Sequence, residues 1–494
     1  MVIKKPRIVI IGAGMSGLTA ANKLYKSGVK KGAFELCVVE GGNRIGGRIN
    51  TSEFSGDRIE MGATWIHGIG GSPVYKIAQE IKSLESEQPW EGMDGFLDDP
   101  ITIAENGYVL DSSLVDPISN LFNNLMAFAQ GNGNGNGNGN GNGSSSVGCF
   151  LKKGLESYWK VESRKEKEGV FGCGDMNKKR LEEAIFAMYE NTQRTYTAAN
   201  DLDNLDYLAE SKYVMYPGEE ITIAKGYSSV IESLASVLPH GVIQLNKKVN
   251  VIEWENECVK GKMGNKAVKI HFLDGTSMSA DHVVVTVSLG VLKAGIFNEN
   301  DDLGMFKFNP PLPDYKIEAI SRLGYGVVNK LFLKLSPEFN LGVDRFPFLQ
   351  MVFHKSDNPV KNVKIPWWIR RTASLSPIYK ESNVLLSWFA GEEALKLESL
   401  PDEVILDESM GSDPLFMGSY SYIATGSSIA DMDIVAEPLP NTKVFESTGD
   451  SPPLQILFAG EATHKTHYST THGAYLSGIR EANRLLQHYH CIDV

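Results

Sequence analysis

Hydrophobic residues first form a short run at residues 7–11, and this run ends in a glycine-rich stretch. Residues 18–26 then place apolar side chains at helical spacing, and residues 34–40 form a second apolar run that ends in an acid. A strand, a helix and a second strand in this order predict a βαβ unit. We expect further strands at residues 242–246, 249–254, 268–272, 282–287 and 455–459, and a final helix over 473–488.

The stretch after the first strand reads Gly-Ala-Gly-Met-Ser-Gly. In such a loop the first glycine permits a tight turn, the second lets the backbone approach a pyrophosphate, and the third lets the helix pack closely. The acid that ends the second strand lies 23 residues beyond the last glycine (40 − 17), where a carboxylate accepts hydrogen bonds from ribose hydroxyls. The spacing therefore predicts a dinucleotide site with the ligands Gly12, Gly14, Ser16, Gly17 and Glu40.

Strands of this type occur at the beginning, middle and end of the chain, with other material between them. We expect an α/β fold, more fully an α+β two-domain protein. Its Rossmann-like domain is assembled from residues 1–75, 217–300 and 440–494, and a second domain with a sheet and helices from residues 76–216 and 301–439. Residues 131–143 merely alternate glycine and asparagine, so we expect a flexible loop there.

The charge balance restricts the partners. The chain has 60 acidic and 48 basic residues, a formal net charge of -12, which disfavours a nucleic-acid partner and suits a cationic substrate. No apolar run reaches the length of a membrane span, so we expect no membrane association. Five scattered cysteines are typical of reduced thiols, which predicts a cytoplasmic protein. No feature indicates an obligate protein partner.

Residues 40–48 read Glu-Gly-Gly-Asn-Arg-Ile-Gly-Gly-Arg, which resembles the E-x-x-x-R-x-G-G-R extension of the flavin-containing amine oxidase family. Further blocks resemble the same family at residues 62–68, 224–227, 286–292, 324–330, 418–422, 458–464 and 470–478. Within the family, the chain is most similar to plant polyamine oxidases of the cytosolic, back-converting kind. The resemblance implies an FAD cofactor, a polyamine substrate and O₂ as the electron acceptor.

The resemblance also implies further cofactor residues. Val249 would meet the adenine through its backbone, and Glu461 would hold a ribityl or ribose hydroxyl. Amides at the start of the last helix would stabilise the reduced flavin near N1. The implied set beyond the glycine loop is Arg48, Gly62, Ala63, Thr64, Trp65, Val249, Gly460, Glu461, Thr470 and Thr471.

Four residues match the family's reaction and substrate positions. Lys330 corresponds to the lysine that holds a water against flavin N5. Tyr420 and Tyr475 correspond to an aromatic pair that faces the flavin and encloses the amine, which suits a cation on approach. His67 stands where relatives carry an acid or histidine that faces the substrate, and we expect it to act in substrate binding and catalysis.

The chain departs from the family pattern twice. Monoamine oxidases attach the flavin to a cysteine at the position of Ser419, so we expect non-covalent FAD here. Family members also have a longer passage before residue 413 than the short connection over residues 400–410. This shortening leaves the integrity of the substrate domain open.

We expect a polyamine oxidase that acts on spermine- or thermospermine-type amines. Hydride would pass to flavin N5, and the products would be an aminoaldehyde or shorter amine and hydrogen peroxide. The alternatives are another flavin amine or amino-acid oxidase, a desaturase, a chromatin-binding demethylase, and a non-catalytic flavin-binding protein. Three histidines could suggest a metal site, but they fall inside a flavin-family block without an acidic or cysteine ligand, so we expect no metal: His464, His467 and His472.

Overall fold

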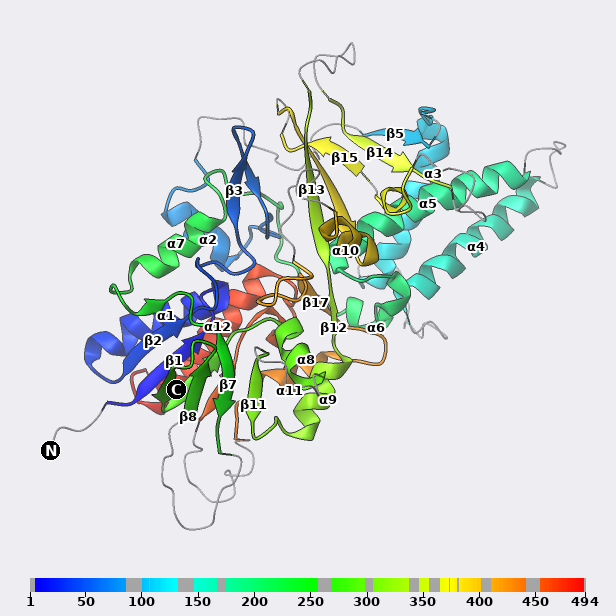
Figure 1. Ribbon diagram of the computed structural model, residues 1–494. Helices are drawn as coiled ribbons and strands as arrows, with labels where there is room; N and C mark the ends of the chain where they lie inside the picture. Colours follow the sequence, from blue (N-terminus) through cyan, green and yellow to red (C-terminus); the bar gives the residue numbers. More distant parts are fainter. Residues whose placement is uncertain are drawn as a thin grey trace.

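The structure is a computed structural model of the 494-residue chain (Figure 1). It describes the chain except residues 1–4, 86–99, 106, 132–145, 167–174, 256–267, 298–304, 337–345, 355–364, 373, 380–381, 401–409, 441–453 and 493–494. Nearly all of the glycine/asparagine tract and most of the short 400–410 connection lie outside the described residues.

The first layer is a five-stranded parallel sheet with the strand order β18-β10-β1-β2-β6. Its strands come from the beginning, middle and end of the chain. They are β1 (Arg7–Ile11), β2 (Glu35–Val39), β6 (Ile243–Gln244), β10 (His282–Val285) and β18 (Ile456–Phe458). The β1, β10 and β18 strands are apolar and almost entirely buried, as expected of a parallel sheet that is covered on both faces.

The two faces of this sheet pack against different layers. Ile8 and Ile10 pack in one core with helices, whereas Val9 and Ile11 pack in another core with a second sheet, as strand alternation requires. The helices are α1 (Met15–Ser27), α2 (Pro73–Glu80), α7 (Ser228–Ser236) and α12 (Thr471–His488). The second sheet has the order β11-β7-β8-β9, with β7 (Val249–Glu253), β8 (Val268–Phe272), β9 (Ser277–Ala280) and β11 (Lys307–Asn309). Beyond it lie α8 (Leu289–Phe297), α9 (Asp314–Arg322) and α11 (Ile429–Ala436) (Figure 1).

The other half of the molecule contains a largely antiparallel sheet with the order β13-β16-β15-β14-β5. These strands are β5 (Ile101–Ala104), β13 (Val328–Lys334), β14 (Leu349–Val352), β15 (Ser374–Pro377) and β16 (Val384–Ala390). Its helices are α3 (Ser112–Ala129), α4 (Val147–Glu166), α5 (Asp175–Thr197), α6 (Tyr207–Glu210) and α10 (Glu392–Glu398). Two strand pairs complete the structure, β3 (Thr51–Phe54) with β4 (Asp57–Glu60), and β12 (Gly324–Gly326) with β17 (Tyr420–Tyr422).

The predicted fold class is confirmed: the protein is a mixed α/β structure with a dinucleotide-type parallel sheet and a second region of sheet and helices. The exact domain limits stay a prediction. Among the described residues, no helix has the length and apolar character needed to cross a membrane.

Candidate active site

A cavity of about 1140 Å³ extends between the two regions. One part of it, here called the sheet-edge part, is lined by residues that lie one or two positions after parallel strands: Gly12, Glu40, Thr286 and Gly460. The other, here called the helix-side part, is lined by residues of α3, α5, β13, β16 and β17. Ligands of open α/β sheets bind at the carboxyl ends of the strands, so the sheet-edge part lies where a dinucleotide is expected.

The glycine loop before α1 has the geometry that its spacing predicts. Gly12 has a φ of 107°, and a Cβ on it would lie 2.5 Å from Thr286 Oγ1. A Cβ on Gly17 would lie 2.0 Å from the carbonyl oxygen of Gly12, so α1 approaches the loop this closely only because residue 17 is glycine. Gly12, Gly14 and Ser16 line the cavity, whereas Gly17 supports the loop from behind.

Glu40 also lines the cavity, and its carboxylate is fixed by the backbone. Oε2 accepts a hydrogen bond from Ala13 N at 2.7 Å, and Oε1 accepts one from Gly42 N at 2.8 Å. Each carboxylate oxygen keeps a further lone pair for a ligand. Val249, at the start of β7, lines the cavity too.

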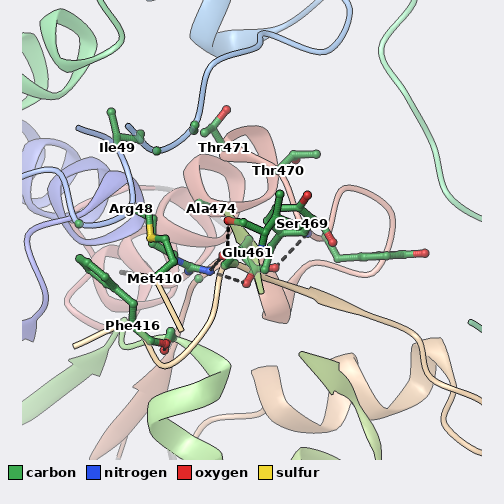
Figure 2. A pocket seen from close by; sticks show the side chains of 18 of the residues that line it. Arg48, Ile49, Met410, Phe416, Glu461, Ser469, Thr470, Thr471 and Ala474 are labelled. Carbon is green, nitrogen blue, oxygen red and sulfur yellow. Dashed lines mark hydrogen bonds and ion pairs between the residues drawn. The ribbon is translucent and has the colours of Figure 1, made fainter. Parts of the chain in front are cut away.

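Arg48 and Glu461 lie at the cavity wall, and their side chains point toward each other (Figure 2). Arg48 Nη1 donates to Glu461 Oε1 at 3.0 Å and to the carbonyl oxygen of Ser419 at 2.7 Å. The other oxygen of Glu461 accepts from Ser421 Oγ at 2.6 Å and from Ser469 N at 2.9 Å. The carboxylate of Glu461 is therefore already bonded to the protein, and its contact with a ribityl or ribose hydroxyl stays a prediction.

The loop after β4 brings four of the expected cofactor residues to the cavity: Gly62, Ala63, Thr64 and Trp65. A Cβ on Gly62 would lie 2.0 Å from the carbonyl oxygen of Arg48, so glycine is needed where the two segments meet. Gly460, with a φ of 135°, and the first residues of α12, Thr470 and Thr471, complete the expected set.

Lys330 reaches this loop from β13 and is 5% exposed. Its Nζ donates to the carbonyl oxygens of Glu60 and Gly62, both at 2.6 Å, and to Thr64 Oγ1, and it lies 4.5 Å from the centre of the Trp388 ring. An ammonium has three N–H donors. A water bound to it would therefore have to replace or share one of these acceptors, and the role at flavin N5 stays a prediction.

His67 lines the cavity and forms an ion-pair contact that the sequence did not indicate. Its Nδ1 lies 3.0 Å from Glu220 Oε1, and this hydrogen bond lowers the pKa of Glu220. The carbonyl oxygen of His67 accepts from His472 Nε2 at 3.1 Å, for the tautomer that carries the proton there. His67 is thus oriented by two partners from other segments.

The structure brings only one residue of the expected aromatic pair to the cavity wall. Tyr420 lines the cavity, its hydroxyl donates to the carbonyl oxygen of Thr195, and burial raises its pKa. Tyr475 does not line the cavity, because the cavity touches only the N-terminal turn of α12, up to Ala474. The Tyr475 ring packs instead against the core that contains α2, so this structure does not bring it to the cavity, and its contact with the substrate stays a prediction. The aromatic lining beside Tyr420 comes from other residues: Trp65, Tyr196, Tyr213, Trp388, Tyr422 and Tyr468.

An acid that the sequence analysis did not single out lies in the cavity wall. Glu210, at the end of α6, is 7% exposed, and burial raises the pKa of its carboxyl group. Gln130 Nε2 donates to its Oε1 at 3.3 Å. None of the sequence motifs described above includes Glu210, so only the folded structure could reveal this acid.

The three histidines considered for a metal have separate partners. His467 Nδ1 lies 2.6 Å from the carbonyl oxygen of Val214, and His472 Nδ1 lies 3.3 Å from Ser72 Oγ. Nδ1 of His464 accepts from His467 N at 3.2 Å. Across the described ranges, no three histidine, cysteine or acidic residues are grouped so that they could hold a metal ion.

Comparison with known proteins agrees with this geometry. The model of the family described as flavin containing amine oxidoreductase matches residues 15–412 and 409–486. The chain belongs to the flavin-containing amine oxidoreductase family. It is 54% identical over 551 residues to probable polyamine oxidase 5 of Arabidopsis thaliana, with 99% of each chain covered. It is 45% identical to polyamine oxidase 1 of Oryza sativa subsp. japonica (99% and 98% covered) and 31% identical to human peroxisomal N(1)-acetyl-spermine/spermidine oxidase (97% and 95%).

As a flavin-containing amine oxidoreductase the protein is an enzyme that uses a flavin, and the glycine loop, the helix terminus and Glu40 fit a dinucleotide form of that cofactor.

The comparisons also bear on the short connection before residue 413. The alignment with the Arabidopsis relative, at 551 residues, is longer than the 494-residue chain, and the two stretches matched by the family model meet at residues 409–412. Glu398 at the end of α10 fixes the chain beyond the connection, because its carboxylate accepts from Gly411 N at 2.6 Å and Ser412 N at 3.0 Å.

Proposed function

We propose that this enzyme is an FAD-dependent polyamine oxidase that acts on spermine- or thermospermine-type amines. The observation that carries the proposal is the continuity of the cavity, which joins a dinucleotide loop to a compartment lined by carboxylates and aromatic rings. The relatives named above are polyamine oxidases by name, which supports the same substrate class.

In this proposal the sheet-edge part holds FAD. The N-terminus of α1 and the glycine loop contact the pyrophosphate, Glu40 accepts from the ribose, and the backbone of Val249 contacts the adenine. Ser419 has no thiol that could form a thioether, so the cofactor would be non-covalent. Its Oγ accepts from Val328 N at 2.8 Å and donates to Val328 O at 3.0 Å. Acid precipitation should accordingly release all of the yellow FAD into the supernatant; colour that stays in the pellet would contradict this assignment.

The helix-side part holds the polyamine. Polyamines carry several ammonium groups, and a buried carboxylate such as Glu210 is stabilised by a cation that enters beside it. Glu220, which lines the cavity beside His67, supplies a second carboxylate. Among the described lining residues, the cationic side chains of arginine and lysine are Arg48, bonded to Glu461, Lys330, bonded to the three acceptors named above, Lys247, bonded to Asp274, and Lys248. This composition favours an amine over an amino acid, whose carboxylate needs a cationic partner.

The surrounding residues prepare the amine for oxidation. Aromatic walls such as Tyr420 and Trp388 exclude water from one amine nitrogen and thereby favour its neutral form. FAD, when bound, would supply N5 as the acceptor for a hydride from the adjacent carbon, and O₂ would take up the two electrons and give hydrogen peroxide. Lys330 holds the loop at Thr64, which would face the cofactor. Water would then hydrolyse the resulting imine to an aminoaldehyde and a shorter amine. Spermine would thus be converted back to spermidine.

We further propose that the enzyme works in the cytoplasm without an obligate partner. Among the described residues, Cys37, Cys149 and Cys491 are in no disulfide, which supports a reducing compartment.

The deciding experiment is anaerobic mixing of the purified yellow protein with spermine, thermospermine, N1-acetylspermine or an L-amino acid. We expect the tetraamines to bleach the flavin, and air to restore the colour with formation of peroxide. Spermidine as the product of spermine would establish back-conversion. Bleaching by the amino acid alone, or by none of the compounds, would exclude the proposed function.

A further inference from the structure

A buried acid lies just behind the cavity wall. Glu60 ends β4 and is 4% exposed, and the cavity is lined by the next residues, Met61 and Gly62, but not by Glu60 itself. Burial raises the pKa of Glu60 to about 7, although its hydrogen bonds oppose this rise. Because a buried carboxylate is costly unless it is well bonded, its partners show what the residue holds in place.

One set of hydrogen bonds leads from Glu60 to Lys330. The carbonyl oxygen of Glu60 accepts from Lys330 Nζ at 2.6 Å, and the same Nζ donates to Gly62 O and Thr64 Oγ1. Lys330, Gly62 and Thr64 all line the cavity. We call this set the lysine branch.

A second set leads from Glu60 to the start of α12. Oε1 of Glu60 accepts from Tyr227 N at 2.9 Å, and Tyr227 is completely buried. The Tyr227 hydroxyl lies 2.5 Å from Thr471 Oγ1, and Thr471 lines the cavity. We call this set the tyrosine branch.

The other carboxylate oxygen joins the two segments behind the wall. Oε2 of Glu60 accepts from Thr51 Oγ1 at 2.8 Å. Thr51 and Ser228 are bonded reciprocally, because each side-chain oxygen accepts from the other residue's N–H at 3.0 Å. A Cβ on Gly226 would lie 2.6 Å from Thr51 Cγ2, so the β3–β4 hairpin and the turn before α7 pack too closely for a side chain at residue 226.

We propose that Glu60 is a positioning residue that holds the lysine branch and the tyrosine branch in one rigid frame, so that Thr64 and Thr471 keep a fixed separation across the flavin site. The inference rests on the proposed function, in which Lys330 and Thr64 lie toward flavin N5 and Thr471 toward N1. Neither Glu60 nor Tyr227 touches the cavity, so both act through the residues that do.

A carboxylate is needed because both of its oxygens act as acceptors. Glutamine has the same shape but only one acceptor oxygen, so in Glu60→Gln either the Tyr227 N–H or the Thr51 hydroxyl loses its acceptor. Tyr227→Phe leaves that N–H in place and removes only the contact with Thr471. The two substitutions therefore disturb the same branch at different points.

The test measures the reduction potential of bound FAD in the full-length holoenzyme by equilibration with a reference dye and a chemical reductant, without any amine. Tyr227→Phe should weaken the binding of reduced FAD relative to oxidised FAD about tenfold, a fall in potential of about 30 mV for a two-electron couple. In a Glu60→Gln background the same change should shift the potential by less than half as much, because the branch is already released. Glu232→Gln, an exposed acid on α7, serves as the control and should keep the parent potential.

The proposal fails if Tyr227→Phe has the parent potential, or if its shift is equal with and without Glu60→Gln. Should Glu60→Gln not retain FAD, Thr51→Val replaces it in the same cycle, because it removes one donor to the carboxylate and leaves the cavity lining unchanged. Failure of the proposed substrate class would be seen separately, as a parent enzyme that a chemical reductant bleaches and spermine does not.

Discussion

The two parts of the cavity are built in opposite ways. The sheet-edge part is formed by main chain at closely approaching loops, where the space around Gly12, Gly17 and Gly62 leaves no room for a Cβ. The helix-side part is formed by long side chains from distant segments, such as Glu210, Lys330 and Tyr420. The sheet-edge part therefore requires glycines, which have no Cβ, whereas the helix-side part requires particular functional groups. The same protein should respond to substitution very differently in the two.

The largest effect is expected where an added methyl group has no space. Gly17→Ala would place a Cβ 2.0 Å from Gly12 O, so the loop must move and FAD retention should be lost completely. Gly14→Ala is the matched control, because a Cβ there meets no protein atom closer than 3.6 Å. We expect the Gly14→Ala apoprotein to melt within a few degrees of the parent, and the Gly17→Ala apoprotein to melt far lower. Equal melting temperatures of the Gly17→Ala and Gly14→Ala apoproteins would contradict the claim that the sheet-edge part has no room for a Cβ at residue 17.

Lys330→Met tests a functional group at the boundary between the parts. It keeps the packing but removes three donated hydrogen bonds, so a step at N5 should slow roughly ten- to a thousandfold while FAD is retained. Stopped-flow measurement of anaerobic reduction and aerobic re-oxidation identifies the slowed step. Lys334→Met, at the exposed end of the same strand, is the control. Parent rates in both half-reactions would make Lys330 purely structural.

Glu210→Gln tests the helix-side part alone. Loss of a charge-assisted contact of about 1.5–3 kcal/mol should lower kcat/KM for spermine roughly 10- to 100-fold, mainly through KM. FAD content should not change, because Glu210 lies on the α6 side of the cavity. Glu219→Gln, an exposed acid nearby in sequence, should behave as the parent. A loss of FAD together with activity would show that the parts are not independent.

The smallest effect concerns stability without ligands. Burial raises the pKa of Glu210 in the folded protein, so the folded state binds this proton more tightly than the unfolded state. The stability contribution is then fully present below the unfolded pKa and is lost as pH rises through the folded value. Glu210→Gln should therefore stabilise the apoprotein by about 1 kcal/mol at pH 8 and by less at pH 5, as seen in thermal melts at both pH values. A variant that is less stable at pH 8 would contradict the assignment.

The sequence predicts the sheet-edge part of the cavity better than the helix-side part. The strand, the glycine loop, Glu40 and the helix are local, so their spacing alone fixes their geometry. The contact of Lys330 with Gly62 in the loop after β4 joins residues 268 positions apart, and no pattern in the sequence reports it. Tyr475 was placed in the cavity because it belongs to a family block. Such a block does not reveal that the cavity ends one residue earlier, at Ala474.

The strand order of the parallel sheet also affects how the protein is made. β1 lies between β10 and β2, and β10 pairs with β18, which begins 445 residues after β1 ends (456 − 11). At about 5–20 residues per second, a ribosome needs roughly 20–90 s to synthesise this interval. β1 lacks its neighbour β10 until residue 285 has been made, and β10 then lacks β18 for the rest of this interval. These unpaired apolar strand edges need protection from aggregation while the chain emerges. The wall formed by Gly460 and α12 is synthesised last, so under the proposed function FAD would be held only after this segment has been made.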